Sequence, residues 1–381
     1  MIHLLHKYDC CGCHACMQVC PKQCILMHAD VEGFLYPEVD ANVCIECGLC
    51  EKVCPMLNRG VPRRPLEVYA VKCADEVRMV SSSGGLFTRL AEQVIAAGGV
   101  VFGAKYSAEW IVVHDYTETL EGFAAFRGSK YVQSIVGDTY RQAESFLKAG
   151  RRVLYSGTPC QIAALKHFLR KEYDNLLTVD VVCHGVPSPL VWQEYLKSIV
   201  SLEENIRFVN MRDKRKGWSS YCINVRTDRR DICVPALKCV YIEGFLRDLY
   251  LRPSCYACLF KAGSSGSDVT LGDFWGVAKF HSEFADEKGV SLALVWSERG
   301  AEVVHSSKSV VTESTYENAK AFNPSIECST SEPKMRGLFW KMFEQDGAKA
   351  IEAVCRKMRP ALFLRMLTKV KSIIRQMIYS K

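Results

Sequence analysis

Two runs of cysteine near the N-terminus have the residue types and spacing of iron–sulfur ligands. The first run is Cys10, Cys13, Cys16 and Cys20, closed by Pro21, and the second is Cys44, Cys47, Cys50 and Cys54, closed by Pro55. In this C-x2-C-x2-C-x3-C-P pattern the fourth cysteine ligates the other cluster. The pattern therefore predicts one [4Fe–4S] cluster on Cys10, Cys13, Cys16 and Cys54, and a second on Cys44, Cys47, Cys50 and Cys20. Paired structural zinc is the alternative, although zinc sites rarely use this run.

A second, looser group of cysteines lies further along the chain. Cys255 and Cys258 form a C-x-x-C pair, and Cys183 closes an apolar run that is typical of a buried strand. Cys160 follows Thr158 and Pro159, which suit the cap and the first position of a helix. A cysteine at a helix N-terminus is favoured as thiolate, the form that binds iron.

Spacing alone leaves three interpretations of this second group. Cys160, Cys183, Cys255 and Cys258 supply the four ligands that a third [4Fe–4S] cluster needs. In a second, equally favoured interpretation, Cys160 and Cys183 are small buried apolar side chains and the C-x-x-C pair binds zinc or nothing. A less favoured interpretation makes Cys160 a nucleophile, but no His or acidic partner is evident. Cys11 and Cys24 fall outside both N-terminal patterns, and we interpret them as packing thiols.

Two loops have residues that suit an anionic ligand. Ser81–Gly85 (SSSGG) opens a helical pattern, and free N–H groups there can bind a phosphate, although a plain loop with an N-cap is equally consistent. Gly128–Tyr131 (GSKY) offers a cation and an aromatic ring, which could bind a flavin, although most such loops are merely solvated.

Apolar periodicity places these motifs in an alternation of strands and helices. Strands are expected at 67–72, 100–105, 110–115, 153–155, 176–183 and 268–275, and helices after Ser81–Gly85, at 137–149, after Cys160 and around 192–200. The alternation favours an α/β domain with a mostly parallel, helix-covered sheet. Shorter alternating runs at 206–242 indicate an antiparallel insertion, and residues 24–44 predict two short strands with a turn at Glu32 and Gly33, as in an α+β two-cluster module.

Length and composition suggest two or three domains in a reducing compartment. The chain has 381 residues and twenty cysteines, of which ten lie in the first fifty-four residues and eight of these are in cluster spacing. No signal peptide pattern and no apolar run of bilayer length is present, so we expect a cytoplasmic protein. The predicted domains are 1–58 for the two-cluster module, 66–149 and 150–325 for the two parts of the α/β domain, and 334–381 for a basic helical tail; 59–65 reads as a linker.

The net charge of +7 belongs to the tail. Residues 334–381 hold twelve Lys and Arg against three acidic residues, so the rest of the chain is slightly negative, and we expect no nucleic-acid partner. After Pro360, apolar residues recur at three- and four-residue steps from Phe363 to Ile378. We slightly favour a helix packed on the protein's own core; the alternative is peripheral contact with an anionic membrane surface on its cytoplasmic side.

Several motifs together resemble the coenzyme F420 hydrogenase/dehydrogenase beta-subunit family. They follow the two-cluster module in the order SSSGGLFTRL, RGSKYVQS, VLYSGTPCQIAALKHFL, VDVVCHGVPSP, CYACLFK and SDVTLGDFWG, within residues 3–310. The resemblance implies a bacterial-type ferredoxin domain fused to an FAD-binding α/β domain with its own [4Fe–4S] cluster, and it favours the third-cluster interpretation of Cys160, Cys183, Cys255 and Cys258. It places flavin contacts at Ser82, Ser83, Gly84, Gly85, Lys130, Tyr131 and Thr158. Coenzyme F420 is an alternative partner that the family's name implies.

The sequence therefore predicts an iron–sulfur flavoprotein oxidoreductase. A ferredoxin-like donor, or a partner oxidoreductase subunit, would supply electrons that the clusters and FAD deliver to an organic substrate, with the cofactors supplying the chemistry. Similarity to the ferredoxin-coupled branch of the family suggests surface-polysaccharide synthesis. The competing hypothesis is a non-catalytic electron-transfer subunit of a larger complex. No residue pattern identifies a catalytic acid, base or substrate.

Overall fold

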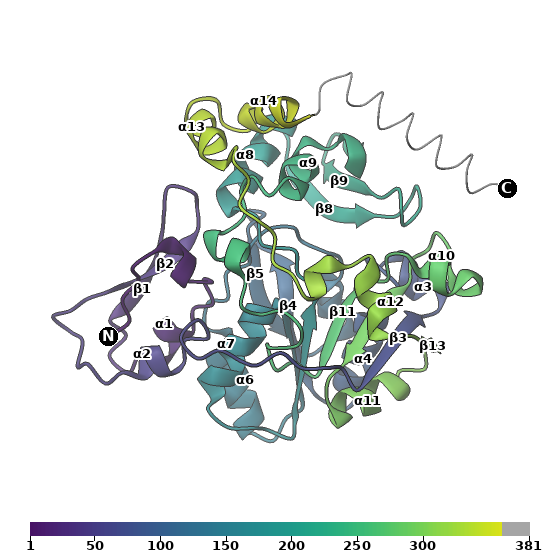
Figure 1. The fold of residues 1–381 in the computed structure, drawn as a ribbon, viewed down its shortest axis with the longest axis horizontal. Helices are drawn as coiled ribbons and strands as arrows, with labels where there is room; N and C mark the ends of the chain where they lie inside the picture. The colour runs from purple at the N-terminus through teal and green to yellow at the C-terminus, as the bar shows by residue number, and fades with distance from the viewer. Residues whose placement is uncertain (360–381) are drawn as a thin grey trace.

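The computed structural model describes residues 1–359, in which an N-terminal iron–sulfur module lies against one side of a larger α/β domain (Figure 1). Each cysteine run ends in a short helix, α1 (Ala15–Val19) or α2 (Leu49–Lys52), and between them β1 (Ile25–Ala29) pairs antiparallel with β2 (Leu35–Val39). The turn of this hairpin includes Gly33 at φ +80°, a backbone conformation that glycine adopts without strain. The predicted hairpin and its turn are present.

The α/β domain is organised around one eight-stranded sheet. In spatial order its strands are β13 (Val310–Glu313), β3 (Glu67–Lys72), β12 (Ser291–Val295), β11 (Val269–Asp273), β7 (Leu176–Val181), β6 (Val153–Gly157), β4 (Val100–Tyr106) and β5 (Val112–Thr117). Strands from 66–149 and from 150–325 pair directly with each other, because β4 lies beside β6 and β3 beside β12. Both predicted parts therefore build a single sheet.

The sheet is mixed, whereas the sequence predicts a mostly parallel one. The neighbours β11, β7, β6 and β4 are parallel, while β5, β12, β3 and β13 add antiparallel pairs. The parallel strands are those connected by helical crossovers, as predicted from the strand–helix alternation. β4 and β5 instead form a hairpin, and the later strands β12 and β13 were not predicted.

Helices cover both faces of the sheet. On one face α4 (Leu86–Ala96) and α11 (Glu298–His305) pack on Val71, Val101 and Leu154. On the other face α6 (Thr139–Lys148) and α7 (Pro159–Leu169) pack on Phe102 and Tyr155, and α1 of the iron–sulfur module packs in turn on α6 and α7. The module therefore extends the hydrophobic core of the α/β domain.

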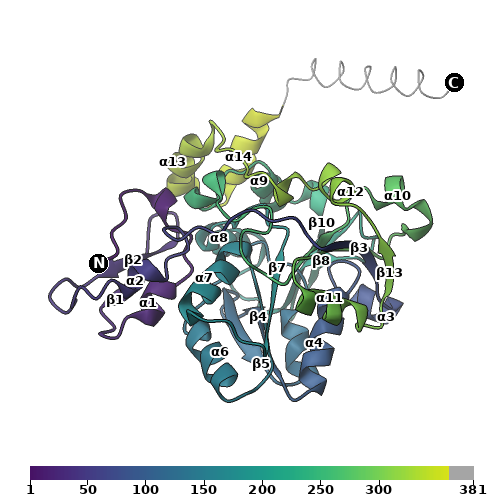
Figure 2. The same cartoon turned by 60° about the horizontal axis from the view of Figure 1, so that its bottom comes forward.

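A second core lies beyond one end of the sheet, above it in Figure 1, and Figure 2 shows the same elements after a 60° turn. It is built from the predicted antiparallel insertion, with strand order β10-β9-β8, and from four helices. These elements are β8 (Ile206–Asp213), β9 (Cys222–Thr227), β10 (Asp231–Pro235), α8 (Pro189–Ile199), α9 (Val240–Leu246), α13 (Arg336–Asp346) and α14 (Lys349–Met358). The first part of the predicted tail is thus helical and packed on the protein. The predicted amphipathic segment after Pro360 lies outside the described residues.

Short elements complete the chain. The remaining short helices are α3 (Asp75–Met79), α5 (Leu120–Phe123), α10 (Val277–Phe280) and α12 (Tyr316–Ala321). The 3-10 helices are η1 (Lys7–Asp9), η2 (Ala124–Phe126), η3 (Ala236–Lys238), η4 (Pro253–Ala257), η5 (Ser282–Phe284) and η6 (Pro324–Ile326). Within residues 1–359, no helix is long and apolar enough to cross a membrane.

Candidate functional site

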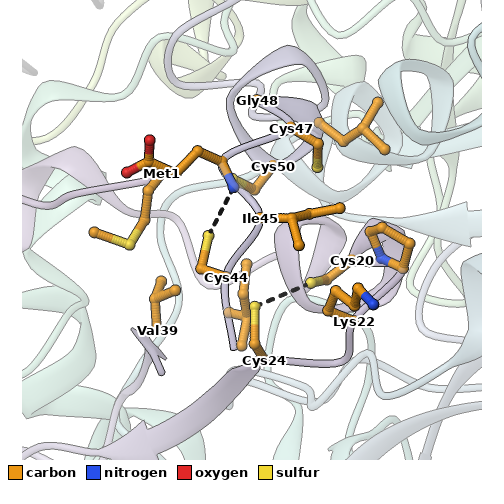
Figure 3. A pocket seen from close by; sticks show the side chains of 14 residues that line it. Met1, Cys20, Lys22, Cys24, Val39, Cys44, Ile45, Cys47, Gly48 and Cys50 are labelled. Atoms are coloured by element: carbon orange, nitrogen blue, oxygen red, sulfur yellow. Dashed lines mark hydrogen bonds between the residues drawn. The ribbon is translucent and has the colours of Figure 1, made fainter. Parts of the chain in front are cut away.

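Four cysteines, which we call the outer set, line one pocket together with Cys24 at the exposed end of the iron–sulfur module (Figure 3). The outer set is Cys20, Cys44, Cys47 and Cys50. Backbone N–H groups point at its sulfurs: Ile2 N lies 3.3 Å from Cys50 Sγ, and Glu46 N lies 3.4 Å from Cys44 Sγ. Such donors stabilise thiolates. Cys47 is exposed and Cys44 partly so, so solvent reaches this set directly.

The remaining four module cysteines form an inner set, Cys10, Cys13, Cys16 and Cys54, which faces the α/β domain. Burial first, and then the neighbouring charges of Cys13, Cys10 and Cys54, raise the pKa of the Cys16 thiol. Gly12 N donates to Cys10 Sγ at 3.4 Å. The structure thus brings together the same two groups of four that the sequence pattern assigns to two clusters.

Cys11 and Cys24 are buried, but each also contacts a predicted ligand. Cys24 Sγ lies 3.4 Å from Cys20 Sγ. Hydrogen bonds with Cys13 and Cys160, followed by burial, raise the pKa of Cys11 well above that of a free thiol. Cys11 therefore lies between the inner set and Cys160, a position that the spacing of the first run could not reveal.

Cys160 lies in the first turn of α7, as predicted. Thr158 N donates to Gln161 Oε1 at 2.9 Å and Pro159 takes the first helical position, so the helix begins where the sequence indicates. Against burial, the hydrogen bond with Cys11 and a 3.1 Å contact with the Thr158 hydroxyl lower the pKa of Cys160 to about 7. This thiol is therefore more acidic than an ordinary cysteine.

The structure also gathers the four scattered cysteines, here called the third set. Cys160, Cys183, Cys255 and Cys258 line one cavity, together with Cys11, Arg252 and Lys261. Two of them follow β6 and β7 at the carboxyl edge of the parallel strands, where such sheets place their sites. Burial raises the pKa of Cys255 to about 12, and Val186 N donates to its sulfur at 3.4 Å.

The donor atoms of each of the three sets suit a cubane [4Fe–4S] cluster. Each supplies four thiols to one site, and each has at least one N–H group or cation directed at it. Among residues 1–359, no three His, Cys, Asp or Glu side chains lie close enough together to hold a single metal ion. Because burial keeps Cys255 and Cys183 protonated, metal binding there must release protons.

A buried ion pair joins the module to the third set. Glu32, in the β1–β2 turn, accepts two hydrogen bonds from the Arg336 guanidinium, and both side chains are about 10% exposed. Arg336 Nε also contacts the hydroxyl of Tyr256 at 3.2 Å. Since Tyr256 lies between Cys255 and Cys258, the β1–β2 hairpin helps to hold the C-x-x-C loop in place.

The two loops predicted to contact a flavin lie side by side. Ser129 N donates to Ser82 Oγ at 2.7 Å, so the Ser81–Gly85 turn and the Gly128–Tyr131 loop meet directly. The polar side chains are largely bonded within the protein: Ser83 Oγ donates to Val290 O, and Lys130 Nζ donates to three carbonyls of residues 125–128. Burial lowers the pKa of Lys130 to about 7.

Gly84 and Gly85 have structural reasons to be glycine. A Cβ on Gly84 would lie 2.1 Å from Val71 O, so the turn packs directly on β3 and β12. Gly85 has φ +91° at the N-cap of α4. Of the other predicted contacts, the Tyr131 ring packs on Phe245, and the Thr158 hydroxyl contacts Cys160 in the third set. No single cradle is formed by all seven residues.

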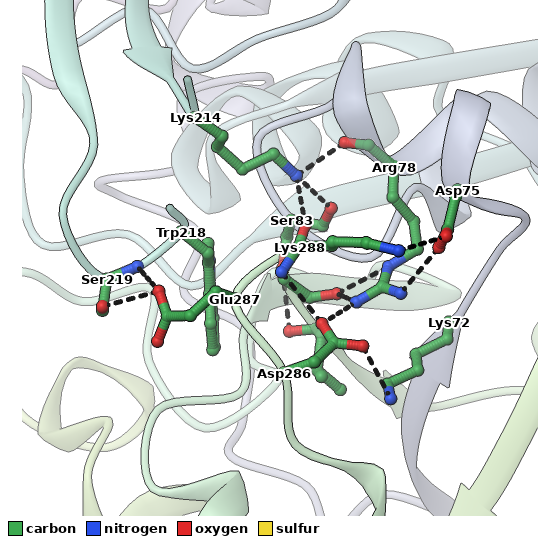
Figure 4. Close-up of polar contacts among 12 residues, drawn as sticks. Lys72, Asp75, Arg78, Ser83, Lys214, Trp218, Ser219, Asp286, Glu287 and Lys288 are labelled. Atoms are coloured by element: carbon green, nitrogen blue, oxygen red, sulfur yellow. Dashed lines mark hydrogen bonds and ion pairs between the residues drawn. The ribbon is translucent and has the colours of Figure 1, made fainter. Parts of the chain in front are cut away.

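A polar cluster near Ser83 was missed by sequence reasoning (Figure 4). Lys214 Nζ donates to Ser83 O at 3.0 Å, and Arg78, Lys72 and Asp286 continue the network. Beside it, Arg212 is paired with Asp273 at 2.8 Å, and Trp218 stacks on Trp275. Arg212 Nε is buried without a hydrogen-bond partner. The motifs SSSGGLFTRL and SDVTLGDFWG contain Ser83 and Asp273 of this region, but neither indicated Arg212 or Lys214.

Comparison with known proteins agrees with the iron–sulfur character of the N-terminal module. Residues 150–318 match the family described as the C terminus of the coenzyme F420 hydrogenase/dehydrogenase beta subunit, and residues 9–57 match the 4Fe-4S dicluster domain. Residues 150–318 are thus similar to this beta-subunit family. The resemblance stated from the motifs is confirmed, and so is the iron–sulfur, electron-transfer character of an oxidoreductase-type chain.

Two curated proteins and one solved structure are similar to parts of the chain. Pyruvate synthase subunit PorD of Thermotoga maritima is 36% identical over 63 residues, which is 16% of this chain and 57% of that protein. A 7Fe ferredoxin of Hydrogenibacillus schlegelii is 43% identical over 42 residues, 11% of this chain and 47% of that protein. The chain thus spans about half the length of these relatives. The F420-reducing [NiFe] hydrogenase complex from Methanosarcina barkeri aligns over 76% of this chain and 91% of its own, with 17% identity and a TM-score of 0.45.

Proposed function

We propose that this chain is a member of the beta-subunit family and an iron–sulfur flavoprotein oxidoreductase with three [4Fe–4S] clusters and FAD. One observation carries the proposal most: four cysteines from three separate segments line a single cavity that also contains Cys11 of the ferredoxin domain. Four thiols at one site are a full ligand set for a cubane. A ferredoxin-like donor or a partner subunit would exchange electrons with the ferredoxin domain.

The chain's own residues prepare the third set for a negatively charged group. Val186 N donates to Cys255 Sγ, and the N-terminus of α7 presents its free N–H groups on the side of Cys160. Arg252 and Lys261 add two cations to the cavity wall. Lys261 Nζ is held by Cys183 O at 2.7 Å, so its charge is fixed beside the ligands.

The flavin part of the proposal is supported by the meeting of the two predicted loops. Ser82 and Ser129 are hydrogen bonded, which puts the helix N-terminus of α4 next to Lys130. Bound clusters would supply one-electron transfer, and FAD would supply the conversion between one- and two-electron chemistry. The turn and Lys130 would orient the anionic part of the coenzyme, and Arg212, whose Nε has no partner, lies nearby on the same network as Lys214.

A non-catalytic electron-transfer subunit is the second candidate. The names of the relatives describe a subunit of pyruvate synthase and a hydrogenase complex, and the ferredoxin domain exposes one cysteine set to a partner. Turnover of an organic substrate by the isolated chain would exclude this candidate. The substrate, including any link to polysaccharide synthesis, is a proposal that rests on the family resemblance alone.

The third cluster is tested by counting iron. Anaerobically purified protein should hold about twelve irons, four for each cubane. Cys255→Ser should remove about a third of them and leave the ferredoxin clusters in place. Cys328→Ser is the matched control, because Cys328 is exposed and belongs to none of the three sets. An iron count in Cys255→Ser equal to that of the control would contradict the third cluster.

A further inference from the structure

Arg252 is a fully buried cation at the boundary between the ferredoxin domain and the third set. Its Nε donates to Cys10 O at 2.7 Å, and its Nη2 donates to Leu35 O at 2.9 Å and to Cys10 Sγ at 3.4 Å. Its Nη1 donates to Gln133 Oε1 at 3.0 Å. None of these four acceptors is a carboxylate. The same side chain lines the cavity of the third set.

The ferredoxin loop is shaped around this guanidinium. A Cβ on Gly12 would lie 2.6 Å from Arg252 Nη1 and 2.9 Å from Arg252 Cζ, so only glycine leaves room for the cation between Cys10 and Cys13. The ring of Tyr36 lies on another side, with its centroid 4.3 Å from the Arg252 Cζ. Arg252 is therefore enclosed by the inner set, the hairpin and the third set.

A buried cation needs a compensating negative charge. Leaving a charge unpaired in the interior costs several kcal/mol or more, and natural proteins pair such groups. Arg336, in the same interface, follows this rule with Glu32. For Arg252, the negative charge at hand is that of the cysteine thiolates that would bind iron: Cys10 at direct contact, and the third set across the cavity wall.

We propose that Arg252 is the counter-cation of the inner cluster and sets its reduction potential. Reduction adds one electron, and hence one negative charge, to a cluster, so a fixed cation that donates to a ligand sulfur raises the potential. The proposed effect on the reduction potential of the inner cluster requires only that the dicluster domain binds its clusters. A corresponding effect on the potential of a third cluster also rests on the function proposed above.

Redox titration of the anaerobic full-length protein, monitored by electron paramagnetic resonance, tests this assignment. Arg252→Gln removes the charge and should shift the midpoint potential of the inner cluster to a more negative value. Gln133→Glu keeps Arg252 but places a carboxylate on its Nη1, and should shift the same midpoint in the same direction. Arg252→Lys retains the charge and should titrate closer to the wild type.

The outer cluster and Arg141 supply the internal controls. Arg252 does not line the pocket of the outer set, so the midpoint potential of the outer cluster should stay unchanged in every variant. Arg141→Gln removes a cation of the same interface whose Nε donates to Gln18 O at 2.6 Å and touches no cysteine, so it should leave the inner midpoint unchanged. If Gln133→Glu, with full iron, titrates like the wild type, the assignment is wrong, even where Arg252→Gln fails to fold. A shift in Arg252→Gln or Gln133→Glu supports it whether or not Cys255→Ser loses iron.

Discussion

The cysteine sets and the predicted flavin loops differ in what their polar atoms already bond to. In the third set, four sulfurs face one cavity; Val186 N donates to Cys255 Sγ, and Cys160 contacts the Thr158 hydroxyl and Cys11. In the flavin loops, Ser82, Ser83 and Lys130 are bonded to other parts of the protein. The sulfurs of the third set converge on one cavity, whereas the flavin loops are held together by hydrogen bonds within the protein.

This difference teaches how much each kind of site can be recognised from its residues. A cluster site is defined by side chains that converge without bonding one another, so gathering the ligands is itself informative. A nucleotide site depends on backbone N–H groups and on loop shape, which the protein also needs for its own packing. Substitutions at the Glu32–Arg336 ion pair, in the Ser81–Gly85 turn and in the polar cluster around Asp286 test whether each region has a structural role or binds a cofactor.

The largest effect is expected at the ion pair that holds the cysteine region together. Glu32→Gln leaves the Arg336 guanidinium buried without its counter-charge, and breaking such a pair costs about 3–5 kcal/mol. Because Arg336 also holds Tyr256, we expect faster hydrogen exchange both in the β1–β2 hairpin and in η4. Lys7→Gln is the control, since the Lys7–Asp30 pair of the same module is half-exposed and should contribute about 1 kcal/mol or less. Equal exchange in the two variants would show that docking does not depend on the buried pair.

An intermediate effect is expected at the flavin turn. Ser82→Asp can still accept the hydrogen bonds of Ser129 but adds a negative charge next to the proposed phosphate site, so the purified protein should contain several-fold less flavin. Ser82→Asn has nearly the same size without the charge and should retain flavin. Gly84→Asp is unsuitable as a test because a Cβ at this position would lie 2.1 Å from Val71 O. The flavin content is measured by the absorbance of flavin released on denaturation. A full flavin content in Ser82→Asp would show that the phosphates bind elsewhere.

The smallest effect concerns the polar cluster beside Ser83. Although burial alone would raise it, the hydrogen bonds from Arg78, from the Lys288 backbone and from Lys72 hold the pKa of Asp286 below its usual value of 3.8. A lowered folded-state pKa stabilises the fold above the unfolded-state pKa, and this stability is lost as pH falls through the lowered value. Asp286→Asn should therefore cost about 1 kcal/mol at pH 7, because the carboxylate is one-third exposed, and progressively less below pH 4.

Denaturant unfolding at several pH values measures this change. Glu283→Gln, an exposed neighbour, should be neutral at each pH. A cost for Asp286→Asn that stays constant from pH 7 to pH 3 would mean that the carboxylate's charge does not stabilise the cluster.

Local features of this structure could be predicted from the sequence, and long-range ones could not. The cap of α7 and the start of β3 depend on neighbouring residues, and both begin where the pattern indicates. The groups of four cysteines also follow from spacing within each run. By contrast, the contacts of Arg252 with Cys10 and of Arg336 with Glu32 join segments more than two hundred residues apart. These contacts form only when the two domains dock, and a local sequence pattern cannot predict which residues then meet.

The antiparallel strands were missed for a related reason. β12 (SLALV) is a short apolar run, and its alternation cannot tell whether its neighbours run parallel or antiparallel. Its place between β3 and β11 is set by chain connections over long distances. Cys11 shows the same limit, since its burial could be expected but its contact with Cys160 could not.

The unequal exposure of the two halves of the ferredoxin domain has a consequence for how such a chain can change over time. The inner half is fixed by its contacts with α6, α7 and Arg252, so nearly every substitution there meets a neighbour. The outer half ends in the loop around Cys44 and Cys47, where Val43 and Ile45 are exposed. Substitutions in that loop can alter its surface while the sheet and its cavity stay the same, so under the proposed function one α/β domain could be matched to different electron carriers.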